Sequence, residues 1–141
     1  MNEQVIALVA AFDSSGELLL LRRPDDVHCG GLWSLPGGKV EDAETPLDTA
    51  ARELQEETGL VGSYWRQLGR FRHDYPARCL NFFVFTCICR DLAGFSPESE
   101  AAWVPLADIG QYPMPEANAK LLPLLKLPSV GAYLQELSTA P

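Results

Sequence analysis

The feature that most constrains this chain is the segment GKVEDAETPLDTAARELQEETGL, because it specifies one helix from its beginning to its end. Thr45 is a favourable N-cap residue, Pro46 follows at the first helical position, and Asp48 completes a short-armed capping box. Gly59 is the glycine expected just beyond a helix C-terminus. These residues predict an α-helix over about 46–58, roughly 20 Å long at 1.5 Å per residue.

The predicted helix has two distinct faces. An apolar stripe at the i, i+3, i+4 spacing consists of Leu47, Ala50, Ala51, Leu54 and Thr58. Glu53, Glu56 and Glu57 fall on another face as neighbours, where like charges repel unless a cation lies among them. Mg²⁺ is usually held by a few carboxylates together with substrate phosphates. Arg52 is expected to pair with Glu44 and to pin the incoming loop. If the three glutamates are considered without the rest of the segment, the alternative is a solvated acidic face.

Nine positions of this segment, spaced G-x5-E-x7-R-E-L-x-E-E-x-G-L, resemble the Nudix box, here residues 38–60. They are Gly38, Glu44, Arg52, Glu53, Leu54, Glu56, Glu57, Gly59 and Leu60. The resemblance implies a hydrolase that cleaves nucleoside diphosphates linked to another group. It also implies an α/β fold, an α/β/α sandwich with a central mixed sheet, and the order of predicted strands and helices supports the same layering.

Composition narrows the class of protein further. The 141 residues suit one domain, 1–141, and the net charge of −8 argues against a grip on nucleic acid polymers. Seven of the 19 acidic residues lie within 41–57, so part of this imbalance belongs to the site itself. The four cysteines include no C-x2-C pair, which disfavours zinc. Without a signal peptide or a long apolar segment, the expected location is the cytoplasm, with no membrane partner.

Apolar runs and turn residues predict the remaining elements. The expected strands cover 5–12, 18–21, 64–71, 80–89 and 101–104. The first two should form a hairpin across the turn at Asp13–Gly16, and a loop at His73–Pro76 should separate the third from the fourth. A helical segment over 117–127 should be kinked or split by Pro123, since an interior proline removes a hydrogen bond. Residues 128–141 are expected to form a surface tail with a short helix.

Outside the box, the resemblance is strongest to the MutT group of 8-oxo-dGTP diphosphatases. The matching segments are LLLLRRPDDVHCGGLWSLPGGKVE, RHDYPARCLNFFVF and YPMPEANAKLL. The resemblance implies nucleotide contacts from Arg23, His28, Ser34, Leu35, Pro36 and Gly37, with Asn118 reading the purine edge. An arginine can donate charge-assisted hydrogen bonds to phosphate or sugar, and an amide offers both a donor and an acceptor.

Simpler interpretations remain open for several of these residues. Arg22 and Arg23 are alternatively a solvated strand end. Asn118 is alternatively a helix-start residue, and His28 a surface-loop residue. Tyr75, Phe83 and Trp33 are candidates for stacking on a base, although aromatic residues in strands more often belong to a core. Tyr75 ranks first among them, because it is expected in a loop.

The expected cofactor is Mg²⁺, with Mn²⁺ as a possible substitute. Candidate ligands are the Gly37 carbonyl and the carboxylates of Glu53, Glu56, Glu57, Glu98 and Glu100. Glu53 either bridges metal ions or accepts a proton from the attacking water, and Arg52 and Glu44 support it. The resemblance implies one further loop carboxylate, which is either Glu98 or Glu100. Ala43, where relatives often carry glycine, is expected to alter its loop slightly, because alanine tolerates positive φ poorly.

The expected reaction is hydrolysis of a nucleoside triphosphate to its monophosphate and pyrophosphate, with a small nucleotide as the partner. Such a reaction needs positioning and charge neutralisation more than a protein nucleophile. Alternatives are a Nudix hydrolase of modified dCTP, ADP-ribose or dinucleoside polyphosphates, a non-catalytic nucleotide-binding module, and an acidic-helix interaction protein. The sequence leaves monomer and homodimer equally open.

Overall fold

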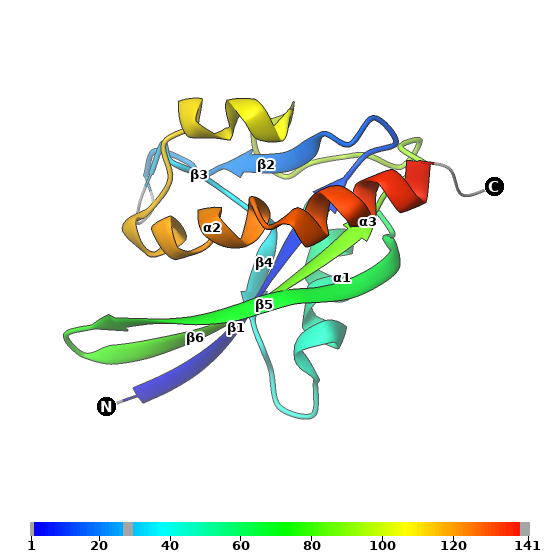
Figure 1. Ribbon diagram of the computed structural model, residues 1–141. Helices are drawn as coiled ribbons and strands as arrows, with labels where there is room; N and C mark the ends of the chain where they lie inside the picture. The colour runs from blue at the N-terminus through cyan, green and yellow to red at the C-terminus, as the bar shows by residue number, and fades with distance from the viewer. Residues whose placement is uncertain (1, 27–29, 139–141) are drawn as a thin grey trace.

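The computed structural model describes residues 2–26 and 30–138, which form a seven-stranded sheet flanked by helices (Figure 1). In chain order the elements are β1 (Asn2–Phe12), β2 (Leu18–Arg22), β3 (Trp33–Ser34), β4 (Gly37–Lys39), α1 (Pro46–Thr58), β5 (Ser63–Tyr75), β6 (Arg78–Ile88), β7 (Ala101–Val104), η1 (Leu106–Gln111), η2 (Glu116–Lys120), α2 (Leu122–Leu125) and α3 (Pro128–Ser138). The strand order is β3-β2-β1-β6-β5, with β4 beside β1 and β7 beside β2. Only β1 and β6 pair in parallel among the described strands, so the sheet is mixed, as predicted.

Side chains of β1 alternate between two cores, because successive residues of a strand point to opposite faces of the sheet. Ala7 and Val9 pack with Leu54 of α1 on one face. Leu8 and Phe12 pack with apolar side chains of α2 and α3 on the other face. Figure 1 shows α1 and the α2–α3 pair on opposite sides of the sheet, so the predicted α/β/α sandwich is confirmed.

The buried side of α1 differs from the predicted stripe, because it includes Thr49 and leaves out Leu47 and Ala51. Its buried residues are Thr49, Ala50, Leu54 and Thr58. Ala51 is exposed, and Leu47 is 41% exposed. Leu47 lies at the N-terminal end of α1, where it lines an open groove with Trp65 and Phe83 instead of entering the core.

The predicted loop at residues 73–76 is wrong, because strand β5 continues to Tyr75. His73 pairs with Leu80 and Tyr75 pairs with Arg78, which leaves only Pro76 and Ala77 to connect β5 to β6. Proline fits this connection, since it lies outside the paired strands and has no ladder hydrogen bond to lose.

The predicted hairpin between the first two strands forms only next to its turn. The Asp13 amide donates to the Glu17 carbonyl, and Phe12 pairs with Leu18. Beyond Leu18, β2 pairs with β7, the predicted last strand, and with β3. β2 therefore leaves β1 after one pair, and β4 pairs with β1 elsewhere along the strand.

The helical segment predicted over 117–127 is split, as expected: η2 ends at Lys120, α2 begins at Leu122, and Pro123 lies in the first turn of α2. The expected surface tail needs correction, because α3 buries Val130 and Tyr133 at 2% exposure each. The Tyr133 hydroxyl donates to the Tyr64 carbonyl at 2.8 Å, which ties α3 to β5. Within the described ranges, none of the helices has the length and apolarity needed to cross a bilayer.

Candidate active site

Helix α1 begins and ends as the sequence predicts. The Thr45 hydroxyl accepts a hydrogen bond from the Asp48 amide at 3.1 Å, and the Asp48 carboxylate accepts one from the Thr45 amide at 3.0 Å. Gly59 follows the helix with φ of 76°, and its amide donates to the Gln55 carbonyl. Because both ends are fixed, the glutamates of α1 have set positions relative to strand β4.

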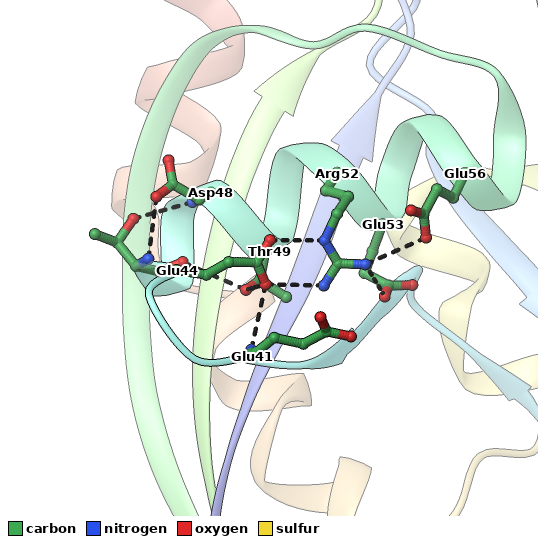
Figure 2. A network of polar contacts seen from close by, with 8 residues as sticks. Glu41, Glu44, Asp48, Thr49, Arg52, Glu53 and Glu56 are labelled. Carbon is green, nitrogen blue, oxygen red and sulfur yellow. Dashed lines mark hydrogen bonds and ion pairs between the residues drawn. The ribbon is translucent and has the colours of Figure 1, made fainter.

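Arg52 joins the loop before α1 to the glutamates on the helix (Figure 2). Its Nε and Nη2 atoms donate to both carboxylate oxygens of Glu44, at 2.7 and 2.9 Å. Its Nη1 atom donates to Glu53 at 2.8 Å and to Glu56 at 3.2 Å. The Arg52 guanidinium, and then a Thr49 hydrogen bond, lower the pKa of Glu44 to about 2. The predicted pairing of Arg52 with Glu44 is therefore confirmed.

Glu57 faces strand β4, where its carboxylate accepts a hydrogen bond from the Gly37 amide at 3.1 Å. Burial raises the pKa of Glu57 to about 8, and the nearby Glu53 and Glu98 carboxylates add to this effect while the Gly37 hydrogen bond opposes it. Three carboxylates, those of Glu53, Glu57 and Glu98, are thus close to one another at this point.

Strand β4 lies close to the Glu53 side chain of α1 at Gly38 and to the backbone of β1 at Gly37. A Cβ atom on Gly38 would lie 2.7 Å from the Glu53 carboxyl carbon. A Cβ atom on Gly37 would lie 2.1 Å from the Ala7 carbonyl oxygen. Both distances are too short for a real side chain, so the close backbone approach predicted from the paired glycines is confirmed.

Two adjoining cavities open beside the glutamates, and they share as lining residues Arg23, Ser34, Leu35 and Gly37. The first cavity, of about 280 Å³, is also lined by Glu57 and Glu98. The second, of about 270 Å³, is also lined by Tyr75 and Asn118. Residues predicted for the metal and residues predicted for the nucleotide therefore meet at Gly37.

Asn118 and Tyr75 line the second cavity and not the first. Asn118 is 5% exposed and in the middle of η2, so its interpretation as a helix-start residue is wrong. Its Nδ2 atom lies 3.4 Å from the Ser34 hydroxyl. Tyr75 ends strand β5, with the Arg78 guanidinium 5.2 Å from its ring centre and the His73 ring at its edge.

The two candidate loop carboxylates have different surroundings. Glu98 lines the first cavity, and its amide donates to the Glu57 carbonyl at 2.9 Å. The Glu100 carboxylate lies 3.8 Å from the Arg22 guanidinium, and the Glu100 carbonyl accepts a hydrogen bond from the Arg22 amide. The placement therefore favours Glu98 and turns Glu100 towards the end of β2.

Known proteins resemble this chain along most of its length. The NUDIX domain family model matches residues 2–125. The chain belongs to the Nudix family. An 8-oxo-dGTP diphosphatase from Haemophilus influenzae is 33% identical over 129 residues, covering 86% of this chain and 92% of that protein. A CTP pyrophosphohydrolase from Escherichia coli is 28% identical over 123 residues, covering 84% of this chain and 90% of that protein.

The Nudix assignment extends to the three-dimensional structure. The crystal structure of a MutT protein from Methanosarcina mazei Go1 is similar with a TM-score of 0.73 and 25% identity, covering 99% of this chain and 97% of that one. The predicted Nudix fold and the predicted class of enzyme, a hydrolase of phosphoanhydride bonds, are confirmed. The alternative of an acidic-helix interaction protein is therefore wrong.

Some predicted nucleotide contacts of this Nudix enzyme do not line the cavities. Pro36 is buried, its carbonyl accepts a hydrogen bond from the Val9 amide, and it is absent from both cavity walls among the described residues. Trp33 packs edge-on against Tyr112, and Phe83 lies under the Arg70 guanidinium on the α1 face. His28 lies outside the residues that the structure describes.

The carboxylates of the Nudix helix suit a divalent cation, although they are not gathered as ready-made ligands. Across residues 2–26 and 30–138, no three Asp, Glu, His or Cys side chains form a metal-binding group. Arg52 binds Glu53 and Glu56, whereas the Gly37 amide binds Glu57. Burial, and then the neighbouring Glu53 and Glu98 carboxylates, raise the pKa of Glu57, and a cation with a preference for oxygen ligands would favour its ionised form.

Two residues of the site were not predicted from the sequence. Thr49 donates a hydrogen bond to Glu44, and the available signal was a hydroxyl on the buried side of α1 five positions after that glutamate. Arg78 lines the second cavity beside Tyr75. The signal there was the short Pro76–Ala77 connection, because a two-residue turn places the residues on either side of it opposite each other.

Proposed function

We propose that this enzyme is a Mg²⁺-dependent nucleoside triphosphate pyrophosphohydrolase that converts 8-oxo-dGTP to 8-oxo-dGMP and pyrophosphate. The observation that carries the proposal is that Glu57 and Glu98 line one cavity and Asn118 lines a second, and that the two cavities share Gly37. A buried amide in one cavity and carboxylates in the other suit a ligand with a purine at one end and phosphates at the other. The 8-oxo-dGTP diphosphatase from Haemophilus influenzae supports the choice of substrate.

The residues that would hold Mg²⁺, or Mn²⁺ in its place, are Glu53, Glu56 and Glu57, with the Gly37 carbonyl and Glu98 as further ligands. When bound, the metal neutralises the triphosphate and acidifies the attacking water. Glu57 must lose its proton to bind a cation, so its raised pKa makes metal affinity increase with pH.

The side chains around the cation divide the remaining work. Arg23 donates hydrogen bonds to the phosphates, Tyr75 stacks on the base, and Asn118 donates to and accepts from the purine edge. Glu53 or Glu98 accepts the proton of the attacking water. Arg52 fixes the position of the Glu53 carboxylate through their 2.8 Å hydrogen bond, which suits both metal binding and proton acceptance.

The partner in this proposal is a free nucleotide and no nucleic acid polymer, because the net charge of −8 opposes binding to a phosphate backbone. A reducing cytoplasm is the compartment that suits the buried free thiols of Cys79, Cys87 and Cys89.

A substrate panel tests the proposal. The enzyme with Mg²⁺ is given 8-oxo-dGTP, dGTP, modified dCTP, CTP and ADP-ribose, and pyrophosphate and monophosphate are measured. The highest kcat/KM is expected for 8-oxo-dGTP. A preference for CTP or modified dCTP, consistent with the relative from Escherichia coli, would replace the purine substrate.

Variants at Glu98 and Glu53 separate the two candidate bases. Loss of turnover in Glu98→Gln with unchanged metal affinity assigns the base to Glu98, whereas the same result in Glu53→Gln assigns it to Glu53. Tight nucleotide binding by the wild-type protein, with no product from any substrate in the panel, would instead favour a non-catalytic binding module.

A further inference from the structure

Thr49 is a buried threonine on α1 whose hydroxyl points to the network around Arg52 (Figure 2). Its Oγ1 atom lies 2.8 Å from a carboxylate oxygen of Glu44 and 3.4 Å from the Thr45 carbonyl oxygen. A hydroxyl has one proton to donate, and a nearby carboxylate is a stronger acceptor than a more distant carbonyl. Thr49 therefore donates to Glu44.

The Glu44 carboxylate is held from several directions. Its Oε1 atom accepts hydrogen bonds from Thr49, from the Arg52 Nη2 atom at 2.9 Å and from the Glu41 amide at 3.2 Å. Its Oε2 atom accepts from the Arg52 Nε atom at 2.7 Å. A carboxylate offers about four acceptor sites, so these donors leave Glu44 little freedom to rotate.

The orientation of Glu44 determines where Arg52 points. A guanidinium is planar and rigid, so two hydrogen bonds to one carboxylate fix its plane as well as its position. With that plane fixed, the Nη1 atom lies 2.8 Å from Glu53 and 3.2 Å from Glu56. Thr49 thus acts on Glu53 and Glu56 through Glu44 and Arg52, without contact with substrate.

We propose that Thr49 is a positioning residue for the metal-binding glutamates, because its hydroxyl fixes Glu44 and thereby the direction in which Arg52 holds Glu53 and Glu56. The inference rests on the proposed function, in which these glutamates bind a divalent cation. Partners of metal ligands in other proteins change metal affinity or activity by about 10–100-fold when they are removed. A comparable loss is expected when the Thr49 hydroxyl is removed.

The test compares Thr49→Ser with Thr49→Ala, which differ from each other by one oxygen atom. Mn²⁺ affinity is measured by electron paramagnetic resonance of free Mn²⁺, and the metal-free thermal midpoint is measured alongside. We expect Thr49→Ser to bind Mn²⁺ like the wild type and Thr49→Ala to bind it about tenfold or more weakly. In kinetics with Mg²⁺ and 8-oxo-dGTP, the loss should appear in kcat and in the Mg²⁺ requirement more than in the nucleotide KM.

Thr58→Val provides a matched control on the same helix. The Thr58 hydroxyl is also buried and donates to the Leu54 carbonyl at 2.5 Å, but none of its hydrogen bonds involves Glu44 or Arg52. This variant should lower the thermal midpoint and leave Mn²⁺ affinity unchanged. A merely structural Thr49 would behave in the same way.

Thr49→Val, which keeps the size of the side chain and removes its hydroxyl, checks that an effect in Thr49→Ala does not come from lost volume. If Thr49→Val does not fold, the comparison of serine with alanine still decides. Equal Mn²⁺ affinity in wild type, Thr49→Ser and Thr49→Ala would overturn the positioning role and leave the proposed function intact. A wild-type protein that binds no Mn²⁺ would overturn both.

Discussion

The α1 glutamates and the surroundings of Asn118 are assembled differently. Glu44, Arg52 and Glu53 are joined by hydrogen bonds within ten residues of sequence. By contrast, Asn118 meets Ser34 from 84 positions away, and Tyr75 comes from a third part of the chain. The first half of the site is local and the second is long-range. Substitutions in the two halves should therefore fail in different ways.

The largest expected effect is in the local half. Glu57→Gln should lower kcat with Mg²⁺ by on the order of 1,000-fold, because in the proposed function it removes a charge that binds the metal. Steady-state pyrophosphate release measures this loss. Glu17→Gln, in the turn between β1 and β2, is the matched control and should retain wild-type turnover. Near-wild-type turnover in Glu57→Gln would show that the glutamate cluster is not the reaction centre.

Glu57 should also make the metal-free protein less stable as pH rises. The folded pKa is about 8, against 4.5 for an ordinary glutamate, so between these values the folded state keeps a proton that the unfolded state has lost. Stability should therefore fall from pH 4.5 to 8 by a few kcal/mol, since each pKa unit corresponds to about 1.4 kcal/mol.

Urea unfolding of the metal-free protein at several pH values measures this effect. Glu57→Gln should remove most of the decrease, because its side chain does not titrate. If the stabilities of wild type and Glu57→Gln show the same pH dependence, the pKa of Glu57 is not raised in the folded state.

Arg52→Lys tests whether geometry or charge matters in the local half. Lysine keeps the positive charge but cannot bind both Glu44 oxygens while also reaching Glu53, so activity should fall about 10–100-fold. Arg66→Lys, at an exposed ion pair 3.9 Å from Glu136, is the control and should have little effect. Full activity in Arg52→Lys would mean that a point charge suffices.

Asn118→Ala tests the long-range half. It should lower kcat/KM for 8-oxo-dGTP by about tenfold, since a well-placed pair of hydrogen bonds to a base is worth about 1–3 kcal/mol. Mn²⁺ affinity should not change, because Asn118 does not line the cavity that Glu57 and Glu98 line. An equal loss of kcat/KM for purine and pyrimidine triphosphates would show that Asn118 does not recognise the base.

The smallest expected effect concerns Ala43, in the loop before α1. Ala43 has φ of 69°, the left-handed conformation that alanine tolerates poorly, so the loop keeps this conformation despite the residue. Ala43→Gly should therefore stabilise the protein by up to about 1 kcal/mol, measured by thermal unfolding. Ala51→Gly, on the exposed side of α1, should destabilise it by a similar amount. Destabilisation by both would mean that the loop is not strained.

The expectations from sequence that the structure confirms concern mainly local features. The ends of α1, the Arg52–Glu44 pair and the close approach of Gly37 and Gly38 depend on neighbours in sequence or on the absence of a side chain, and the structure confirms them. The loop predicted around His73 was wrong, because pairing with β6 overrides a polar, proline-containing sequence.

Long-range packing decided the remaining differences. The exposure of Leu47 and the burial of Tyr133 both depend on which strand each side chain meets, and the helical pattern alone does not specify that. Glu98 and Glu100 are two residues apart with the same chemistry, so only the pairing of Arg22 with Glu100 separates them.

The sequence by itself determined the Nudix helix, its caps and the order of its glutamates, because those features are encoded by contacts a few residues apart. The tertiary structure alone decided that Asn118, Tyr75 and Arg23 line one pair of cavities with Glu57. Such choices depend on which distant groups fill the space around a side chain, and no local pattern records them.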